Sequence, residues 1–187
     1  MDWRRKIGNK HRSHAGNRFS YGLASHVHRL HPEGVRAMPI GDVCVRDVVV
    51  ATKDVTIQQA AVLMRQHHVG DLVVVKEGAD GRQIPVGIIT DRDIVVSVIA
   101  PTLNAGVYTV GDLVTRELVT VAEDQGVFEA IQHMRMTGVR RMPVIDREGG
   151  LVGIVSVDDL IQLLSDEMSE LAKLIAREQI HEVESKR

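Results

Sequence analysis

Cysteine, aromatic residues and long apolar runs are scarce in this sequence, and each scarcity excludes a class of protein. The single cysteine, Cys44, excludes an intrachain disulfide and a cysteine-based metal site. No apolar run approaches the roughly 18 residues that a membrane-spanning helix needs, so we expect no membrane partner. Only 3% of the 187 residues are aromatic, but 44% are hydrophobic, enough for one or two small domains. The cysteine usage favours a reducing, cytoplasmic location.

Neither sign of charge dominates the chain, but the charges are unevenly divided. Residues 1–37 hold eight Lys and Arg against two acids, a net of +6, and five of the nine histidines. The remainder holds 15 bases and 23 acids, a net of −8, so no nucleic-acid partner is expected for residues 38–187. Residues 1–37 are interpreted as a disordered arm. The alternatives are a tail for a nucleic acid or acidic partner, an Arg-rich targeting peptide, and a natural start at Met38.

One pattern occurs twice along the chain. The segment Gly87–Val95 returns 66 residues later as Gly153–Ile161, and residues 41–75 match residues 111–145 at an offset of 70. The offset changes because residues 76–85 contain four extra positions, which predicts a longer hairpin loop. Two copies of this length are too few for a solenoid. They predict a pseudo-twofold pair of small domains, and shared clefts are where small ligands tend to bind.

Each copy has the pattern strand, helix, strand, strand, helix. The first copy predicts a strand at Val48–Val50, a helix capped by Thr56 and Gln59, and strands at residues 72–75 and 84–90. The apolar face of that helix is predicted at helical spacing, on Ile57, Ala60, Ala61 and Met64.

The second copy repeats the pattern. Its apolar strand is predicted at Leu118–Val121, with further strands at residues 142–145 and 151–156. Its helix has an apolar face on Val127, Ala130, Ile131 and Met134. The fold class is therefore α/β (α+β), with two β-α-β-β-α repeats. The predicted parts are the arm 1–37, repeat one 38–100, a linker 101–110, repeat two 111–165 and a C-terminal helical extension 166–187.

The helical pattern continues past the second copy. Residues 160–183 contain neither Gly nor Pro, and an apolar stripe with spacings of 3, 4, 3 and 4 runs along them, formed by Ile161, Leu164, Met168, Leu171 and Ile175. Two heptads are too few to hold a coiled coil alone. The stripe either packs onto its own domain or forms a dimer contact.

The motif Gly-apolar-apolar-Thr/Ser-x-x-Asp carries the chemistry of the sequence. Thr90 with Asp93, and Ser156 with Asp159, are capping boxes that begin a helix after a strand. A helix N-terminus also seats a phosphate, and an adjacent Asp can accept both hydroxyls of a ribose. The two motifs therefore suit a nucleoside phosphate.

These doubled motifs, together with Val139–Val144, make the chain resemble a tandem pair of CBS domains, the regulatory module named after cystathionine β-synthase. The resemblance covers about residues 41–165. It implies two repeats whose sheets pack face to face, with up to two clefts for AMP, ADP, ATP or S-adenosylmethionine. None of these is an obligatory cofactor, and Mg²⁺ could accompany the phosphates. The resemblance also implies a homodimer that regulates an unknown protein.

By the same resemblance, the aspartates hold ribose, the hydroxyls contact ribose or phosphate, and arginines clamp phosphate. The implied ligand residues are Thr90, Arg92, Asp93, Arg140, Arg141, Ser156 and Asp159, with Val49 and Val119 as walls for the base. The copies differ where Gly70-Asp71 replaces Arg140-Arg141, and Asp71 would repel phosphate. One site is therefore expected to dominate, with a slight preference for the Thr90/Asp93 site, toward which Arg140 or Arg141 would reach across from the other repeat.

No nucleophile, base and orienting group converge in the sequence, so the protein is predicted to be a regulator and not an enzyme. The leading hypothesis is an adenosyl-nucleotide sensor. The alternatives are a structural or dimerisation module with empty clefts, and an enzyme acting on an adenosyl compound.

Overall fold

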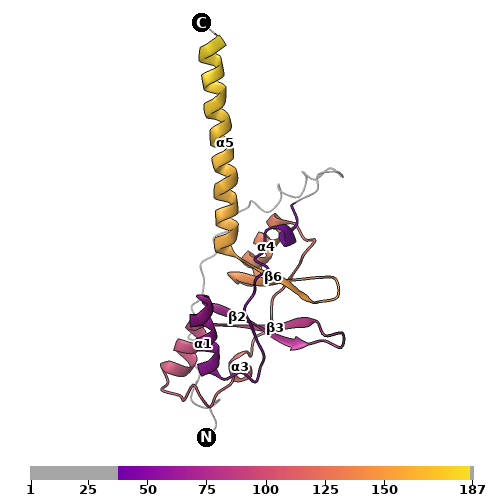
Figure 1. Ribbon diagram of the computed structural model, residues 1–187, viewed down its shortest axis with the longest axis vertical. Helices are drawn as coiled ribbons and strands as arrows, with labels where there is room; N and C mark the ends of the chain where they lie inside the picture. The colour runs from indigo at the N-terminus through magenta and orange to yellow at the C-terminus, as the bar shows by residue number, and fades with distance from the viewer. Residues whose placement is uncertain (1–37, 186–187) are drawn as a thin grey trace, which may run out of the picture. The chain divides into compact units, whose positions relative to one another are not determined.

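The computed structural model describes residues 38–185, with side chains to residue 178, and the predictions for residues 1–37 lie outside it. Both copies show the predicted order of strands and helices (Figure 1). In chain order the elements are η2 (Ile40–Asp42), β1 (Val50–Ala51), α1 (Ile57–His67), β2 (Asp71–Glu77), β3 (Gln83–Thr90), α2 (Asp91–Ile94), the π-helix η3 (Val95–Ile99), α3 (Val110–Leu113), β4 (Val121–Ala122), α4 (Val127–Thr137), β5 (Arg141–Ile145), β6 (Leu151–Ser156) and α5 (Val157–Ser185).

The strands form two three-stranded sheets, β1-β2-β3 and β4-β5-β6. In each sheet the first strand runs parallel to the middle strand and the third runs antiparallel to it. The first strands are shorter and begin later than predicted: β1 is Val50–Ala51 in place of Val48–Val50, and β4 is Val121–Ala122 in place of Leu118–Val121. In the first copy the reason is local, because the Val48 amide donates to the Arg46 carbonyl at 3.0 Å.

Helices α1 and α4 pack their predicted faces against the sheets. The Thr56 amide donates to Gln59 Oε1 at 3.0 Å and Thr56 Oγ1 accepts the Gln59 amide at 3.2 Å, which confirms the capping box. Ala61 is exposed, so the prediction that it belongs to the buried face was wrong. It lies one residue beyond Ala60, at the solvent edge of the apolar arc. The fully buried positions of the two helices are Ile57, Ala60, Met64, Val127, Ala130 and Met134.

Each repeat lends its first segment to the other repeat. The Gly41 amide donates to the Glu123 carbonyl at 3.0 Å, and the equivalent Gly111 amide donates to the Lys53 carbonyl at 2.8 Å. Ile40 is therefore completely buried in the core of the second repeat. Val110 and the residues around it pack in the core of the first repeat in the same way. This reciprocal exchange ties the two cores together through backbone hydrogen bonds.

The exchange explains the glycine that opens each doubled motif. A Cβ on Gly153 would lie 2.6 Å from Cys44 Sγ and 2.7 Å from the Val45 carbonyl, both on the segment lent by the first repeat. At Gly87 a Cβ would collide with Val114 on the segment lent by the second repeat. Only glycine allows the lent segment to approach the third strand this closely.

Helix α5 begins in the second repeat and extends beyond it. Leu160 is 4% exposed in the second core and Leu163 packs against it, whereas every side chain from residue 164 to residue 178 is exposed. The predicted stripe therefore does not pack onto its own domain within the described residues. No helix in the described part of the chain is long and apolar enough to cross a membrane.

Candidate ligand site

Both Thr/Ser-x-x-Asp motifs form the predicted capping boxes. At the start of α2, Asp93 Oδ2 accepts from the Thr90 amide at 3.0 Å and from its hydroxyl at 2.7 Å. At the start of α5, Asp159 Oδ2 accepts from the Ser156 amide at 2.8 Å and from its hydroxyl at 2.6 Å. Within residues 38–178 no hydrogen bond reaches Oδ1 of either carboxylate. Each box therefore keeps an acceptor oxygen for a ligand.

The sheet register sets one charged residue beside each box. Asp71 is the cross-strand partner of Thr90, and Arg141 is the cross-strand partner of Ser156. Directly opposed residues of an antiparallel pair point to the same face of the sheet. The first box therefore has a carboxylate as its neighbour and the second box has a guanidinium.

These two neighbours contact each other. Arg141 Nη1 donates to Asp71 Oδ1 in an ion pair whose side chains are 31% and 19% exposed. The two positions are 70 residues apart, which is the offset between the repeats, so they are equivalent positions that meet near the pseudo-twofold axis. Identical charged residues would repel each other there. The exchange of Arg for Asp in the first repeat turns that repulsion into an attraction.

The surroundings of Asp71 are unfavourable for its charge. Burial raises the pKa of the Asp71 carboxyl, and the nearby carboxylates of Asp91 and Asp159 raise it further, while Arg141 opposes them. Since Asp159 belongs to the box of the second repeat, the field of that box extends to Asp71. Asp91, the Asp159 box and the Arg141–Asp71 ion pair therefore form one electrostatic unit.

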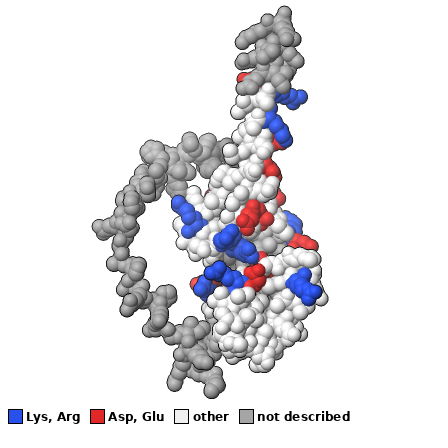
Figure 2. Space-filling view, turned by 90° about the vertical axis from the view of Figure 1, so that its left-hand side faces the viewer, with Lys and Arg blue, Asp and Glu red and all other residues white. Residues whose placement is uncertain are grey.

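The other predicted arginines lie on the outside of this unit. Arg140 Nη2 is 3.6 Å from Asp158 Oδ1, and both side chains are at least 70% exposed. Arg92 is exposed in the first turn of α2, where its backbone amide donates to Asp91 Oδ1 at 2.6 Å. Figure 2 shows basic and acidic side chains close together on one face of the molecule, with no large patch of one sign.

Val49 and Val119, the predicted apolar contacts for a base, lie at equivalent positions in the two repeats. Val49 is half-buried against the core of the first repeat, and Val119 is half-buried against the core of the second. Each precedes the short first strand of its sheet. They are thus equivalent apolar positions with part of each side chain still accessible.

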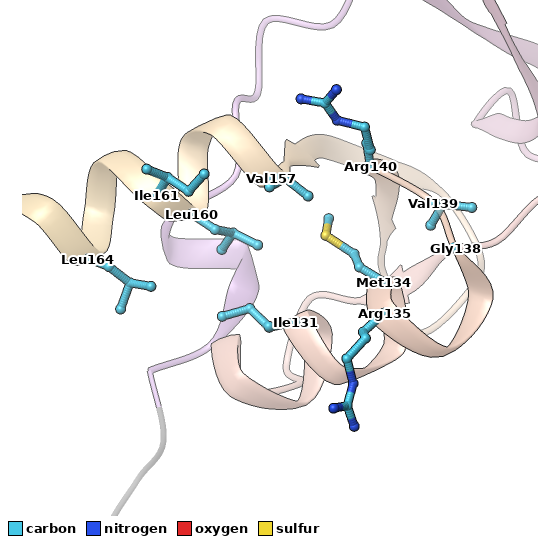
Figure 3. Close-up of a pocket in the computed structure, with 10 residues that line it drawn as sticks. All are labelled: Ile131, Met134, Arg135, Gly138, Val139, Arg140, Val157, Leu160, Ile161 and Leu164. Carbon is cyan, nitrogen blue, oxygen red and sulfur yellow. The ribbon is translucent and has the colours of Figure 1, made fainter. Parts of the chain in front are cut away.

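A pocket of about 520 Å³ lies elsewhere, between α4 and the first turns of α5. Figure 3 shows its apolar side chains converging, while the guanidinium groups of Arg135 and Arg140 point outward. The residues that line it do not include Ser156 or Asp159, so it is not the predicted nucleotide cleft. Among the residues described, no group of three His, Cys, Asp or Glu side chains could hold a metal ion.

Sequence reasoning treated Asp71 as an obstacle to phosphate and missed its bond to Arg141. The signal that could have revealed this contact is the offset itself. In a pseudo-twofold pair, residues at equivalent positions near the axis face each other, and Asp71 and Arg141 have complementary charges. Arg141 contacts Asp71, the cross-strand neighbour of the first box, whereas Arg140 lies near Asp158 of its own repeat.

Comparison with known proteins gives a consistent picture. The CBS domain family model matches residues 40–99 and 110–166. A relative from Arabidopsis thaliana, the mitochondrial CBS domain-containing protein CBSX3, is 38% identical over 67% of this chain and 61% of its own length. The CBS domain-containing protein YhcV of Bacillus subtilis is 32% identical over 76% of this chain and 98% of its own. The chain thus spans nearly all of one relative but less than two thirds of the other.

Among solved structures, the CBS domain pair of protein MJ0100 in complex with 5-methylthioadenosine and S-adenosylmethionine is similar. It matches with a TM-score of 0.60 and 26% identity, over 70% of this chain and 98% of that one.

Proposed function

The chain belongs to the CBS domain family, and on this premise we propose that it is a regulatory module that binds an adenosyl ligand and transmits the binding to a partner protein. The candidate ligands are AMP, ADP, ATP and S-adenosylmethionine. The observation that carries the proposal is the pair of capping boxes joined by the Arg141–Asp71 ion pair. The adenosyl ligands of the MJ0100 domain pair support it by similarity.

Each capping box would bind the ribose of the ligand. Asp93 and Asp159 each have Oδ2 occupied by the helix cap, which fixes the carboxylate and would leave Oδ1 to accept from a ligand. A carboxylate that is already held loses little freedom when it accepts a ribose hydroxyl. Val49 and Val119 would contact the base, because they keep accessible apolar surface beside each sheet.

A phosphate on the ligand would compete with Asp71 for Arg141. The guanidinium has five donors and can bind phosphate in two parallel bonds, but in this structure one of its nitrogens is committed to Asp71. Binding of phosphate would therefore loosen the contact between the repeats. Asp71, Asp91 and Asp159 would oppose the phosphate charge. Arg92 and Arg140 would assist Arg141, and Mg²⁺ could accompany a longer phosphate chain.

This competition supplies a route for signalling. A ligand can shift a conformational equilibrium only by binding one state better than the other. A phosphate that takes Arg141 from Asp71 would favour a state in which the repeats are less tightly linked. The regulated protein would be one that contacts both repeats, because only such a partner could sense how tightly they are linked.

The proposal includes a homodimer in the cytoplasm and no catalytic activity. The exposed apolar stripe of α5 supports association. The second candidate is a dimerisation module with empty clefts, which the same stripe would also serve.

The test is calorimetric and thermal titration of the protein with adenosine, AMP, ADP, ATP and S-adenosylmethionine, using Asp93→Ala and Asp159→Ala. A ligand at a hundred times its dissociation constant should add about 2.7 kcal/mol of stability. For a chain of this size, the unfolding midpoint should rise by about 5–10 °C. The response should be lost in one of the two variants, which identifies the working site.

Asp112→Ala is the matched control. Asp112 Oδ2 accepts from the Thr109 amide and hydroxyl, both at 2.9 Å, so it forms a capping box that does not belong to the candidate site. Its loss should lower stability like the others but leave ligand binding intact. If no adenosyl compound shifts the midpoint, the sensor proposal fails and the dimerisation module takes its place.

Asp71→Asn tests the competition for Arg141. Removing the carboxylate charge should strengthen binding of AMP by about tenfold while adenosine, which has no phosphate, binds as before. Equal changes for the two ligands would contradict a role of Arg141 in phosphate binding.

A further inference from the structure

The pocket of about 520 Å³ between α4 and the first turns of α5 does not belong to the candidate ligand site. Its apolar lining includes Ile131 and Met134 from α4 and Leu160, Ile161 and Leu164 from α5 (Figure 3). Leu160 and Met134 are buried at its base, but Ile161 is 59% exposed and Leu164 is 39% exposed. Exposed apolar surface around a hollow of this size marks a site of interaction.

The arm, residues 1–37, contains side chains that suit such a pocket. Three of the five aromatic residues of the whole chain lie in it, namely Trp3, Phe19 and Tyr21. A tail that only stays solvated is typically poor in aromatic residues, and these are the residues that most often anchor a contact. Phe19, Tyr21 and Leu23 alternate with Ser20 and Gly22, so an extended segment presents all three on one side.

We propose that residues 18–23 of the arm bind in the pocket between α4 and α5 of the same chain, with Phe19 and Tyr21 filling it. A tail for an acidic partner was one of the alternatives for these residues, and α5 of the same chain is then that partner. The contact needs no ligand at either capping box. It therefore goes beyond the proposed function and does not depend on it.

The point where the arm joins the described structure lies close to the pocket. The Val127 amide donates to the Met38 carbonyl at 3.0 Å, and Pro39 forms a β-bridge with Gly126. Ile131, the first pocket residue of α4, is four residues farther along the helix, which is about 6 Å. Residues 24–37 connect the proposed segment to Met38 and can span up to about 50 Å when extended. The segment therefore reaches the pocket of its own chain with length to spare.

Opposite charges favour this contact. The arm has a net charge of +6, with no acid between residues 3 and 32, whereas residues 38–187 have a net charge of −8. Five of those acids lie between Val157 and Glu170, where α5 has no Lys or Arg. Glu167 is exposed one turn beyond Leu164, and Arg18 immediately precedes Phe19. Arg18 would therefore approach Glu167 when Phe19 enters the pocket.

The two arginines at the rim of the pocket are compatible with a peptide segment. Their guanidinium groups point outward from the apolar lining (Figure 3), and Arg140 Nη2 is 3.6 Å from Asp158 Oδ1. Guanidinium groups are donors only, so Arg135 and Arg140 can donate to the backbone carbonyl oxygens of an entering segment. The apolar interior thus accepts the aromatic rings, and the rim accepts the polar backbone.

The size of the contact favours a tethered segment over a separate protein. Phe and Tyr side chains bury roughly 150–250 Å² each, so Phe19 and Tyr21 together would bury roughly 300–500 Å². A stable complex between separate proteins usually buries at least about 1,200 Å² in total. A segment of the same chain needs less area, because its tether holds it at an effective concentration on the order of millimolar.

The first test measures how well the full-length protein protects a thiol at the mouth of the pocket. With Cys44→Ser as background, Leu164→Cys is labelled with a maleimide, alone and together with Phe19→Ser and Tyr21→Ser. We expect the two arm substitutions to raise the labelling rate by about tenfold, because the pocket is then uncovered. Gln162→Cys, exposed on the other side of the same helical turn, should be labelled at one rate in both backgrounds.

A second pair of arm substitutions tests whether the effect belongs to residues 18–23. Val27→Ser with Leu30→Ser removes two apolar residues elsewhere in the arm and should leave the labelling of Leu164→Cys unchanged. Equal rates with and without Phe19→Ser and Tyr21→Ser would overturn the proposal. Protection that grows with protein concentration and ignores these substitutions would also overturn it, because a second copy would then cover the pocket.

The second test locates the arm directly by photo-cross-linking of the full-length protein. With p-benzoylphenylalanine in place of Tyr21, irradiation should join residue 21 to residues 131–134 or 157–164 within single chains. Glu167→Lys should lower the yield severalfold, whereas Glu178→Lys, three turns farther along α5, should not. The same photoreactive group in place of Leu30 should give little of this product. Cross-links that join two chains, or that lie outside α4 and α5, would contradict the proposal.

Discussion

Removal of Arg141 should destabilise the protein much more than removal of its partner Asp71. Arg141→Met keeps the apolar stem of the side chain but removes the charge that opposes Asp71, Asp91 and Asp159. Asp71→Asn instead removes the charge whose burial is unfavourable, and its amide oxygen can still accept from Arg141. The structure therefore predicts an asymmetry within a single ion pair.

The magnitude follows from burial. Breaking a fully buried ion pair by removing one partner costs roughly 3–5 kcal/mol. Since the two side chains of this pair are 31% and 19% exposed, we expect about 2 kcal/mol for Arg141→Met, a fall of about 4–8 °C in the unfolding midpoint. Asp71→Asn should change the free energy of unfolding by less than about 0.5 kcal/mol.

The loss in Arg141→Met should depend on pH. Folding raises the pKa of the Asp71 carboxyl, so its contribution to stability is fully present below the ordinary carboxyl range. That contribution is lost as the pH rises through the raised pKa of the folded state. Without Arg141 this pKa rises further. The destabilisation should therefore be largest near about pH 8 and should shrink as the pH is lowered toward about pH 4.

The assay is urea unfolding of the single and double variants at several pH values, with Arg140→Met as control. Arg140 is the preceding residue, is largely exposed, and contacts Asp158 at 3.6 Å, so its loss should be negligible. The double variant with Asp71→Asn should recover most of the stability lost in Arg141→Met. If Arg141→Met lowers the free energy of unfolding as much at low pH as at high pH, the loss comes from packing of the arginine stem and not from its charge. Equal losses in the two single variants would also refute the reasoning.

Three further predictions concern stability alone, each measured as the change in free energy of unfolding. Gly153→Ala should lower the free energy of unfolding by about 1–3 kcal/mol, because a Cβ would lie 2.6 Å from Cys44 Sγ. The control Gly70→Ala should lower it by less than about 1 kcal/mol, because a Cβ there would meet nothing closer than 3.6 Å. Thr56→Ala should cost about 1 kcal/mol through loss of the α1 cap, and no change would mean that water replaces it. Arg82→Ala should cost less than about 0.5 kcal/mol although Arg82 has three acidic partners, because its side chain is 42% exposed.

Features that depend on neighbouring residues were predicted well. The capping boxes at Thr56, Thr90 and Ser156 formed as expected, because hydroxyl and acceptor lie three residues apart and meet whenever a helix begins there. The buried faces of α1 and α4 followed from helical spacing, except at Ala61 on the edge of the arc. The short first strands were misplaced by one to three residues, because a pair of ladder bonds leaves little periodicity to detect.

The parts of the candidate site could be located in the sequence, but their connection could not. The two boxes and the arginines were identified from the repeated motif, and they lie at equivalent ends of the two sheets. Whether Arg140 or Arg141 would reach the other repeat was open in the sequence. The cross-strand register decided it, because it sets Arg141 beside Ser156 and toward Asp71.

The sequence by itself determined the doubled repeat, its helix starts and the unbroken helix at its end, because all of these arise from interactions within a few residues. Only the tertiary structure decided the exchange of first segments, the close approach at Gly153 and the pairing of Asp71 with Arg141. Each of these contacts joins residues that are far apart in the sequence, from 58 positions for Gly111 and Lys53 to 109 positions for Gly153 and Cys44. Such contacts depend on how two cores pack and on which equivalent positions meet near the axis, and no local pattern encodes that.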